Sequence, residues 1–178
     1  MVSQPIDVLI FEDDRNQVKD IADWLGLAPF QYVFSAKFAQ ATPSGRRPNE
    51  ESELGWTWIE SEIRRVNPKV VVFDYLLNKN RGNASFDGLD YGKRCKRDFW
   101  PELGVILVTT GGDKDQGEYI REQRELDDQR IDKKWAIDCA WVKPWGTAKS
   151  TVTDTKVQAE LQKLIRQSRR PSEHKQAK

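Results

Sequence analysis

The feature that most constrains this chain is a short apolar run, KVVVFDYLL, at Lys69–Leu77. Three valines followed by Phe73 make a run too short for a buried helix. This pattern is typical of a central strand in a parallel sheet that helices cover on both faces. Asp74 then lies at the carboxyl end of the strand, the edge where open α/β sheets bind ligands. Taken alone, Asp74 has a simpler explanation as the cap of the following turn. A functional role requires other charged groups to converge on it.

The rest of the chain alternates apolar runs with amphipathic stretches. Further strands are predicted at Ile6–Phe11, Phe30–Phe38, Gly104–Thr109 and Trp135–Val142. Apolar residues at helical spacing predict helices at Arg15–Leu27, Glu53–Val66, Leu89–Phe99 and Thr153–Gln167, and the polar stretch Lys114–Lys134 predicts an exposed helix or helix pair. Because right-handed crossovers join parallel strands, this order predicts an α/β fold, a doubly wound five-stranded parallel sheet.

Length and composition limit the domain count and the partners. A chain of 178 residues fits one domain, predicted at residues 1–168, and a basic, polar tail at residues 169–178 that we predict to be disordered. The 29 basic and 28 acidic side chains give no charge excess that would favour a nucleic acid or a membrane surface. Without a long apolar segment or an export signal, we expect a soluble, cytoplasmic protein. Cys95 and Cys139 lack metal-ligand spacing and are expected to be reduced core thiols.

Reactive side chains follow four of the five predicted strands. They are Glu12 and Asp13, then Asp74, then Thr109, and finally Lys143. Parallel strands bring their carboxyl ends to one edge, so these groups should meet. Carboxylates that repel each other need a cation between them, and oxygen ligands suit Mg²⁺. With the ion bound, Asp74 can attack phosphorus and form an aspartyl phosphate, while the ammonium and hydroxyl groups neutralise the phosphoryl oxygens.

Four segments carry a resemblance to a known family: VLIFEDD, VVVFDYLL, VILVTTGGD and WVKPW. In order and on matching strands, they resemble the four motif blocks of response regulator receiver domains. The resemblance covers roughly Ile6 to Gln167. It implies the flavodoxin-like receiver fold, with Asp74 as the phosphoacceptor, Thr109 as the switch hydroxyl and Lys143 as the partner of the phosphate.

The same resemblance implies a magnesium site. Asp13 would be a direct ligand, Glu12 would act through water, and Asp74 and the backbone carbonyl of Leu76 would complete the protein ligands. Asp14 is the alternative to Asp13 if the first strand ends one residue later than predicted.

The chain departs from the family's pattern in its loops and in one switch position. The loop after Asp74 is longer than usual and lacks Met-Pro, and Gln40–Ser52 and Lys114–Lys134 are also expanded. Three residues before the lysine, where the family usually has an aromatic switch residue, this chain has Ala140, with Trp141 beside it. We therefore expect the usual coupling of threonine and aromatic rotation to be absent or rebuilt.

The resemblance implies a single-domain response regulator rather than an enzyme, one that relays a phosphoryl signal by conformational change. Its implied partners are a sensor histidine kinase or phosphotransfer protein as donor, a downstream protein target, and a second copy of the chain in a homodimer. Specific nucleic acid and membrane partners are not expected. His174 lies in the tail and is no credible phosphohistidine, and the segment after Gln167 is too short for an output domain.

Two other readings compete with this one. A receiver-like interaction module would keep the fold and signal through its expanded loops without phosphorylation. A haloacid-dehalogenase-like phosphatase would have a second acid two residues after the nucleophile, where this chain has Leu76.

The output surface of the resembled family is formed by its fourth helix, fifth strand and fifth helix. Here that surface would include Lys114–Lys134 with Trp135, Trp141 and Trp145. Exposed aromatic residues are favoured binding anchors, so this face is expected to meet a protein partner. Packing of the same tryptophans in the core is the alternative.

Overall fold

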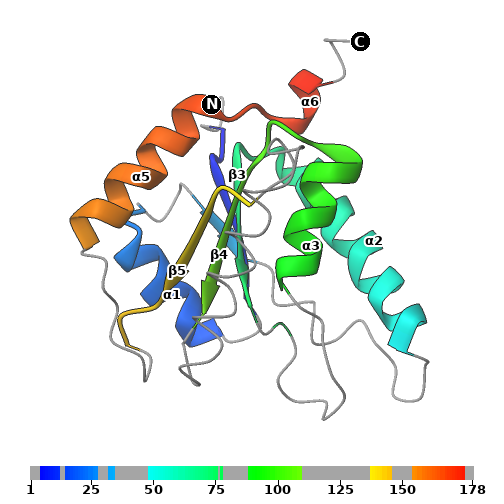
Figure 1. Cartoon of the computed structure of the whole chain (residues 1–178), viewed down its shortest axis with the longest axis horizontal. Coiled ribbons are helices and arrows are strands. Elements are labelled where there is room, and N and C mark those ends of the chain that lie inside the picture. Colours follow the sequence, from blue (N-terminus) through cyan, green and yellow to red (C-terminus); the bar gives the residue numbers. More distant parts are fainter. Residues whose placement is uncertain are drawn as a thin grey trace, which may run out of the picture.

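The protein is built on a parallel sheet, seen here in a computed structural model. The structure describes residues 5–12, 15–27, 32–34, 48–75, 77, 88–109, 137–145 and 154–174. Its described strands are β1 (Val8–Phe11), β2 (Tyr32–Phe34), β3 (Val70–Asp74), β4 (Gly104–Thr109) and β5 (Cys139–Val142). They form a 5-stranded sheet in the order β2-β1-β3-β4-β5, in which all neighbouring strands are parallel (Figure 1). The predicted α/β fold with a parallel sheet is confirmed.

The three central strands are buried over their whole length. Every residue of β1, β3 and β4 is buried, because helices cover both faces of the sheet. Alternate residues point to opposite faces. Leu9, Val71 and Val105 belong to one hydrophobic cluster, whereas their neighbours Ile10 and Val72 belong to the other.

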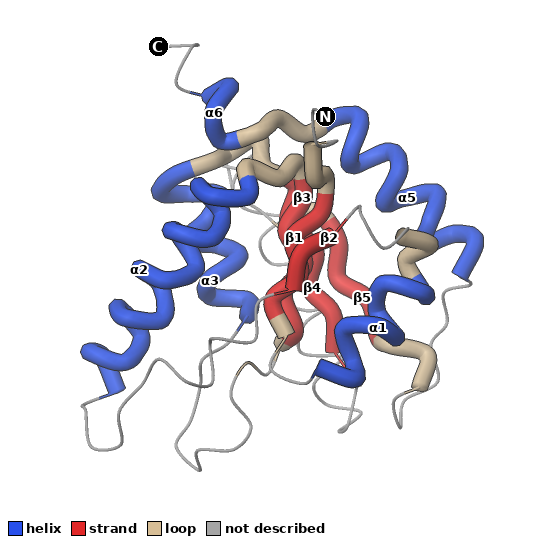
Figure 2. Tube along the Cα trace, turned by 180° about the vertical axis from the view of Figure 1, so that it is seen from behind, coloured by secondary structure: helices blue, strands red, loops and turns tan. Residues whose placement is uncertain are grey.

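Four of the described helices lie in the two outer layers. Helices α1 (Arg15–Trp24) and α5 (Asp154–Gln167) cover one face of the sheet, and α2 (Pro48–Val66) and α3 (Gly88–Arg94) cover the other (Figure 2). Helix α3 continues into a π-helical segment, η3 (Cys95–Phe99). This two-layer cover leaves the carboxyl ends of the strands at one edge of the sheet.

The helix and strand bounds differ from the prediction in detail. Helix α2 begins at Pro48 rather than Glu53, because proline at the first helical position lacks the N–H that would go unsatisfied there. Helix α1 ends at Trp24, and Gly26 adopts a left-handed φ of 66° just beyond it. The predicted helix at residues 114–134 lies outside the described residues. Among the described helices, none is long and apolar enough to span a membrane.

The two cysteines are free of disulfide bonds. Cys95 is fully buried, and burial raises the pKa of its thiol. This thiol should therefore react slowly with alkylating reagents. Cys139 is only partly buried at the edge of the core, so the prediction of a core thiol holds fully for Cys95 alone.

The C-terminal segment differs from the predicted disordered tail. Residues 169–174 are described and include a short helix, α6 (Pro171–His174), that lies at the end of the sheet where β1 and β3 begin (Figure 1). The backbone N–H of Arg169 donates a hydrogen bond to the carbonyl of Glu102 at 3.0 Å. The prediction of disorder is wrong for this stretch because it used composition alone, and specific polar contacts anchor the segment. Residues 175–178 lie outside the described part.

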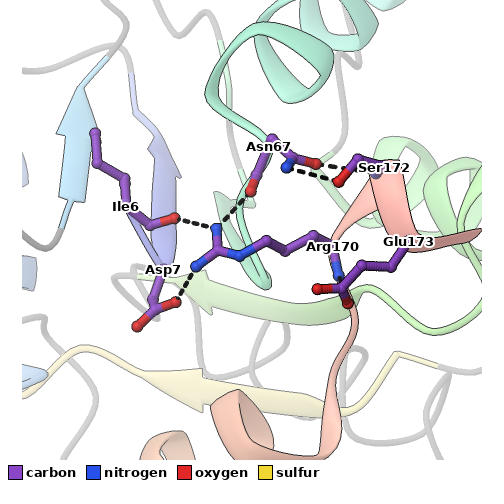
Figure 3. A network of polar contacts seen from close by, with 6 residues as sticks. All are labelled: Ile6, Asp7, Asn67, Arg170, Ser172 and Glu173. Carbon is purple, nitrogen blue, oxygen red and sulfur yellow. Dashed lines mark hydrogen bonds and ion pairs between the residues drawn. The ribbon is translucent and has the colours of Figure 1, made fainter. Parts of the chain in front are cut away.

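Arg170 is the centre of this anchoring network (Figure 3). Its guanidinium donates hydrogen bonds to the backbone carbonyls of Ile6 at 2.8 Å and Asn67 at 2.6 Å, and it forms an ion pair with the Asp7 carboxylate. Asn67 and Ser172 exchange two further hydrogen bonds, of 2.9 and 3.0 Å. The C-terminal segment thus supplies donors to carbonyls at the amino ends of β1 and β3, which is where such groups need partners.

Candidate functional site

The candidate site lies at the carboxyl edge of the sheet, opposite the Arg170 network. Glu12 directly follows β1, Asp74 is the last residue of β3, Thr109 is the last residue of β4, and Lys143 directly follows β5. All four are buried, with exposed fractions between 0% and 4%. Ionisable side chains are rarely buried unless they are paired, so their contacts decide what this edge can do.

Lys143 forms ion pairs with both carboxylates. Its Nζ atom lies 2.9 Å from Glu12 Oε2 and 2.9 Å from Asp74 Oδ1, and it donates a further hydrogen bond to Gln17 Oε1 at 2.7 Å. A lysine ammonium has three N–H donors, so these three acceptors satisfy it completely. These contacts hold the ammonium at the site, because an unpaired buried charge is costly.

Glu12 and Asp74 place two carboxylates around the Lys143 ammonium in a buried space. Carboxylate oxygens are hard ligands of the kind that Mg²⁺ prefers. In their chemistry, the two carboxylates therefore fit part of a Mg²⁺ ligand set.

Part of the predicted metal site cannot be placed. Asp13, the alternative ligand Asp14, and Leu76 all lie outside the described residues. Within the described ranges, no group of three or more His, Cys, Asp and Glu side chains could hold a metal ion. The magnesium site therefore stays a prediction, of which the structure describes the two carboxylates Glu12 and Asp74.

Thr109 lies next to this cluster through the backbone. Its carbonyl accepts a hydrogen bond from the Lys143 N–H at 2.7 Å, and Thr109 pairs with Val142 in the register of β4 and β5. On β3, Asp74 pairs with Val108, the residue that precedes Thr109. The threonine is thus held between the strands that carry Asp74 and Lys143, as a phosphoryl contact at this edge would require.

Ala140, at the expected aromatic switch position, and its neighbour Trp141 face opposite sides of the sheet. Ala140 packs against the cluster on the α2 and α3 face, whereas Trp141 belongs to the cluster on the α1 and α5 face, since consecutive strand residues point to opposite sides. The Trp141 ring lies 6.1 Å from the Trp24 ring, and its Nε1 donates a hydrogen bond to Glu160 at 3.2 Å. Trp141 therefore does not replace an aromatic ring on the Ala140 side.

The predicted tryptophan surface needs a correction. Trp141 is only 5% exposed, so it is a core residue and cannot serve as an exposed binding anchor. Trp145 is 40% exposed, and among the described residues no other large hydrophobic side chain is exposed. Trp135 and the stretch Lys114–Lys134 lie outside the described part, so that part of the prediction is not tested.

Two residues of the site were not identified from the sequence: Gln17, described above, and Gly88. The N–H of Gly88 donates a hydrogen bond to the Tyr75 carbonyl at 2.9 Å. A Cβ atom at Gly88 would lie only 2.0 Å from the backbone carbonyl oxygen of Asp74. Helix α3 can therefore begin against the backbone of Asp74 only with glycine at its first position. A glycine at a helix start, where other residues are better helix formers, is the one signal that the sequence offers.

Gly88→Ala should destabilise the protein by about 1–3 kcal/mol, because a backbone oxygen cannot move aside as a flexible side chain can. Gly92→Ala is a matched control on the same helix, since its new methyl group would meet Val105 Cγ1 at 2.9 Å, a side-chain atom. We expect Gly92→Ala to cost less, also because alanine favours the helix. Urea unfolding of both variants measures the difference, and wild-type stability of Gly88→Ala would contradict the close approach.

Comparisons with known proteins point to one fold. No protein-family model matches the sequence, and no curated protein matches it. Among solved structures, the chain is similar to a response regulator receiver domain protein from Clostridium thermocellum, at 17% identity and a TM-score of 0.52, over 90% of this chain and 94% of that one. It is also similar to the signal receiver domain of an HD domain-containing protein from Pseudomonas fluorescens, at 16% identity and a TM-score of 0.54, over 93% and 90%.

A third similar structure is the isolated REC domain of RcsB from Salmonella enterica serovar Typhimurium, determined in the presence of the phosphomimetic BeF₃⁻. It shares 15% identity and a TM-score of 0.50 over 93% of this chain and 92% of that one. At such low identities the likeness establishes the fold alone, and it confirms the receiver-domain fold that the motif blocks predicted.

Proposed function

We propose that this chain, which has the fold of response regulator receiver domains, acts as a response regulator receiver that accepts a phosphoryl group on Asp74. The observation that carries the proposal is the buried Lys143 ammonium, 2.9 Å from both the Glu12 and the Asp74 carboxylates at the carboxyl edge of the sheet. A signalling role of the response-regulator kind is supported by the fold, and the identity of the acceptor by this geometry.

The proposed reaction uses each of these side chains in a distinct way. The Asp74 carboxylate attacks phosphorus, so that an oxygen–phosphorus bond forms and the bond from phosphorus to the donor breaks. The donor leaves with the bonding electron pair. Lys143 orients the carboxylate before attack and stays beside the added negative charge afterwards. The Thr109 hydroxyl would donate a hydrogen bond to a phosphoryl oxygen.

Magnesium, when bound, would neutralise negative charge on the carboxylates and on the phosphoryl oxygens. Glu12 and Asp74 would hold it, together with Asp13 and the Leu76 carbonyl. Of these residues, Glu12 and Asp74 are already close enough to share one ammonium.

The proposed partners follow from the chemistry. The phosphoryl donor would be a sensor histidine kinase or a phosphotransfer protein, and the signal would pass to a downstream protein or to a second copy of the chain. One observation favours the alternative, a receiver-like module that signals without phosphorylation. At the expected aromatic switch position this chain has Ala140, so no ring there can rotate together with the Thr109 side chain.

Incubation with Mg²⁺ and a small acyl phosphate, followed by intact-mass measurement, tests the proposal. We expect one added phosphate, which should be lost when a chelator replaces Mg²⁺ during the incubation. An unchanged mass under conditions that phosphorylate a known receiver domain would favour the alternative module.

A further inference from the structure

We infer that Gln17 is a positioning residue that couples Lys143 to helix α1. Its side-chain carbonyl oxygen accepts a hydrogen bond from Lys143 Nζ at 2.7 Å. Of the three partners of this ammonium, Gln17 alone is uncharged, since the others are Glu12 and Asp74. The inference deepens the proposed function, because it names the element that responds when a phosphoryl group adds charge at Asp74. It therefore rests on the proposal that Asp74 is phosphorylated.

The three partners of Lys143 come from different parts of the fold. Glu12 follows β1, Asp74 ends β3, and Gln17 belongs to α1. The ammonium has no spare N–H group, so any shift of Nζ toward one partner weakens the bond to another. A phosphoryl group on Asp74 would add up to two negative charges and attract Nζ. The neutral amide of Gln17 lacks the Coulombic attraction of the carboxylates, so its bond is the one that must stretch, break or move with α1.

A second contact links α1 to the segment that carries Lys143. Trp24 lies on α1 about two turns beyond Gln17, on the same face of the helix. Its ring packs edge-to-face against Trp141, at 6.1 Å and 77°, and against Trp145, at 5.8 Å and 83°. Trp141 precedes Lys143 and Trp145 follows it, so α1 meets this segment through one hydrogen bond and two ring contacts. Because Trp145 is 40% exposed, a shift of α1 would reach the molecular surface there.

On the opposite side of β5, the described residues offer a link only at the far end of the strand. There Asp138, five positions before Lys143, pairs with Lys96 of η3 at 2.6 Å. Nearer the lysine, Ala140 presents only a methyl group to that layer. Among the described residues, the hydrogen bond and ring contacts nearest to Lys143 that reach a helix therefore lie on the α1 and α5 face. Helix α1 is the element that a displaced Lys143 would move.

The coupling is measured without phosphate by a double-mutant cycle. Gln17→Met keeps the length of the side chain and removes the oxygen acceptor, and Lys143→Met removes the donor. Each single variant should speed hydrogen exchange in the α1 peptide, Arg15–Trp24, and the double variant should exchange little faster than either one. The product of the two single effects should therefore exceed the effect of the double variant on the exchange rate by on the order of tenfold. Fully additive effects would overturn the inference. Lys19→Met places the same new side chain at an exposed position on another face of α1 and should be additive with Lys143→Met.

One further variant separates positioning from simple packing, and another serves as a replacement in the cycle. Gln17→Glu restores an oxygen acceptor and should restore the coupling, whereas a role in packing alone would be served equally by Gln17→Met. If Lys143→Met does not fold, Asp74→Asn replaces it in the cycle, because it changes the charge that the ammonium faces.

The phosphomimetic BeF₃⁻ with Mg²⁺ then tests the response. Wild type should bind it with a change in α1 exchange, and Gln17→Met should bind it without that change. A Gln17→Met variant that responds like wild type would overturn the inference and leave the proposed function standing. A wild-type chain that binds no BeF₃⁻ would count against the proposed function, and the cycle would still decide the coupling.

Discussion

Asp74→Asn should reduce phosphate incorporation to background while the protein stays folded. The amide is a poor nucleophile, so the oxygen–phosphorus bond cannot form at this position. The remaining amide oxygen can still accept the hydrogen bond from Lys143 Nζ, which lies 2.9 Å from Asp74 Oδ1 in the wild type. The substitution also removes one of the two carboxylate charges beside this ammonium, so relief of the repulsion between the carboxylates offsets the lost ion pair. Without metal, the free energy of unfolding should therefore change little.

Intact mass after incubation with Mg²⁺ and an acyl phosphate gives the first measurement, and urea unfolding gives the second. Asp23→Asn is the matched control, because Asp23 is an exposed carboxylate on α1 and should leave incorporation at the wild-type rate. Incorporation by Asp74→Asn at that same rate would remove Asp74 as the acceptor. A large loss of stability in Asp74→Asn would instead contradict the expectation that relief of carboxylate repulsion offsets the lost ion pair.

Arg170→Met should lower the free energy of unfolding by about 2–4 kcal/mol. Methionine keeps the apolar stem, so the loss isolates the guanidinium. Without it, the carbonyls of Ile6 and Asn67 lose a donor and the Asp7 carboxylate loses its ion pair. We expect a value below that of a fully buried pair, because Asp7 is about one-third exposed and water can replace part of the contact.

Arg169→Met is the matched control for this prediction, since Arg169 is an exposed neighbour whose described hydrogen bond comes from its backbone N–H. It should change stability by less than about 0.5 kcal/mol. Urea unfolding compares the two variants, and equal stabilities would show that the network in Figure 3 does not anchor the C-terminal segment. Phosphate uptake should be unchanged in folded Arg170→Met, because the network lies at the amino ends of the strands.

Much of the candidate site could be predicted because strand ends are a local property of the sequence. The apolar runs before Glu12, Asp74 and Thr109 end at or beside the residues where β1, β3 and β4 end. Once the strands are parallel, their carboxyl ends share an edge, whatever the loops between them do. The position of Lys143 after β5 follows in the same way.

The prediction of an exposed tryptophan failed for Trp141, where the local pattern was ambiguous. Trp141 and Trp145 are both tryptophans in one short segment, yet the first is buried and the second is exposed. Alternation along β5 places Trp141 toward α1 and α5, and only the packing of Trp24 against it shows that this side is closed. Composition alone could not distinguish the two rings.

The sequence by itself determined the elements of this protein that depend on neighbours along the chain: the apolar strands, the amphipathic helices, and the reactive residues at the strand ends. Tertiary structure alone decided the contacts between residues far apart in the chain. Gln17 reaches Lys143 across 126 positions, and Asp7 reaches Arg170 across 163. No periodicity or motif marks such a pair, because a glutamine on a helix or an arginine in a basic tail has the same local pattern whether solvent or a buried partner surrounds it. The physical reason is that hydrophobic patterning sets which face is buried, whereas hydrogen bonding depends on the position of individual atoms after the layers have packed.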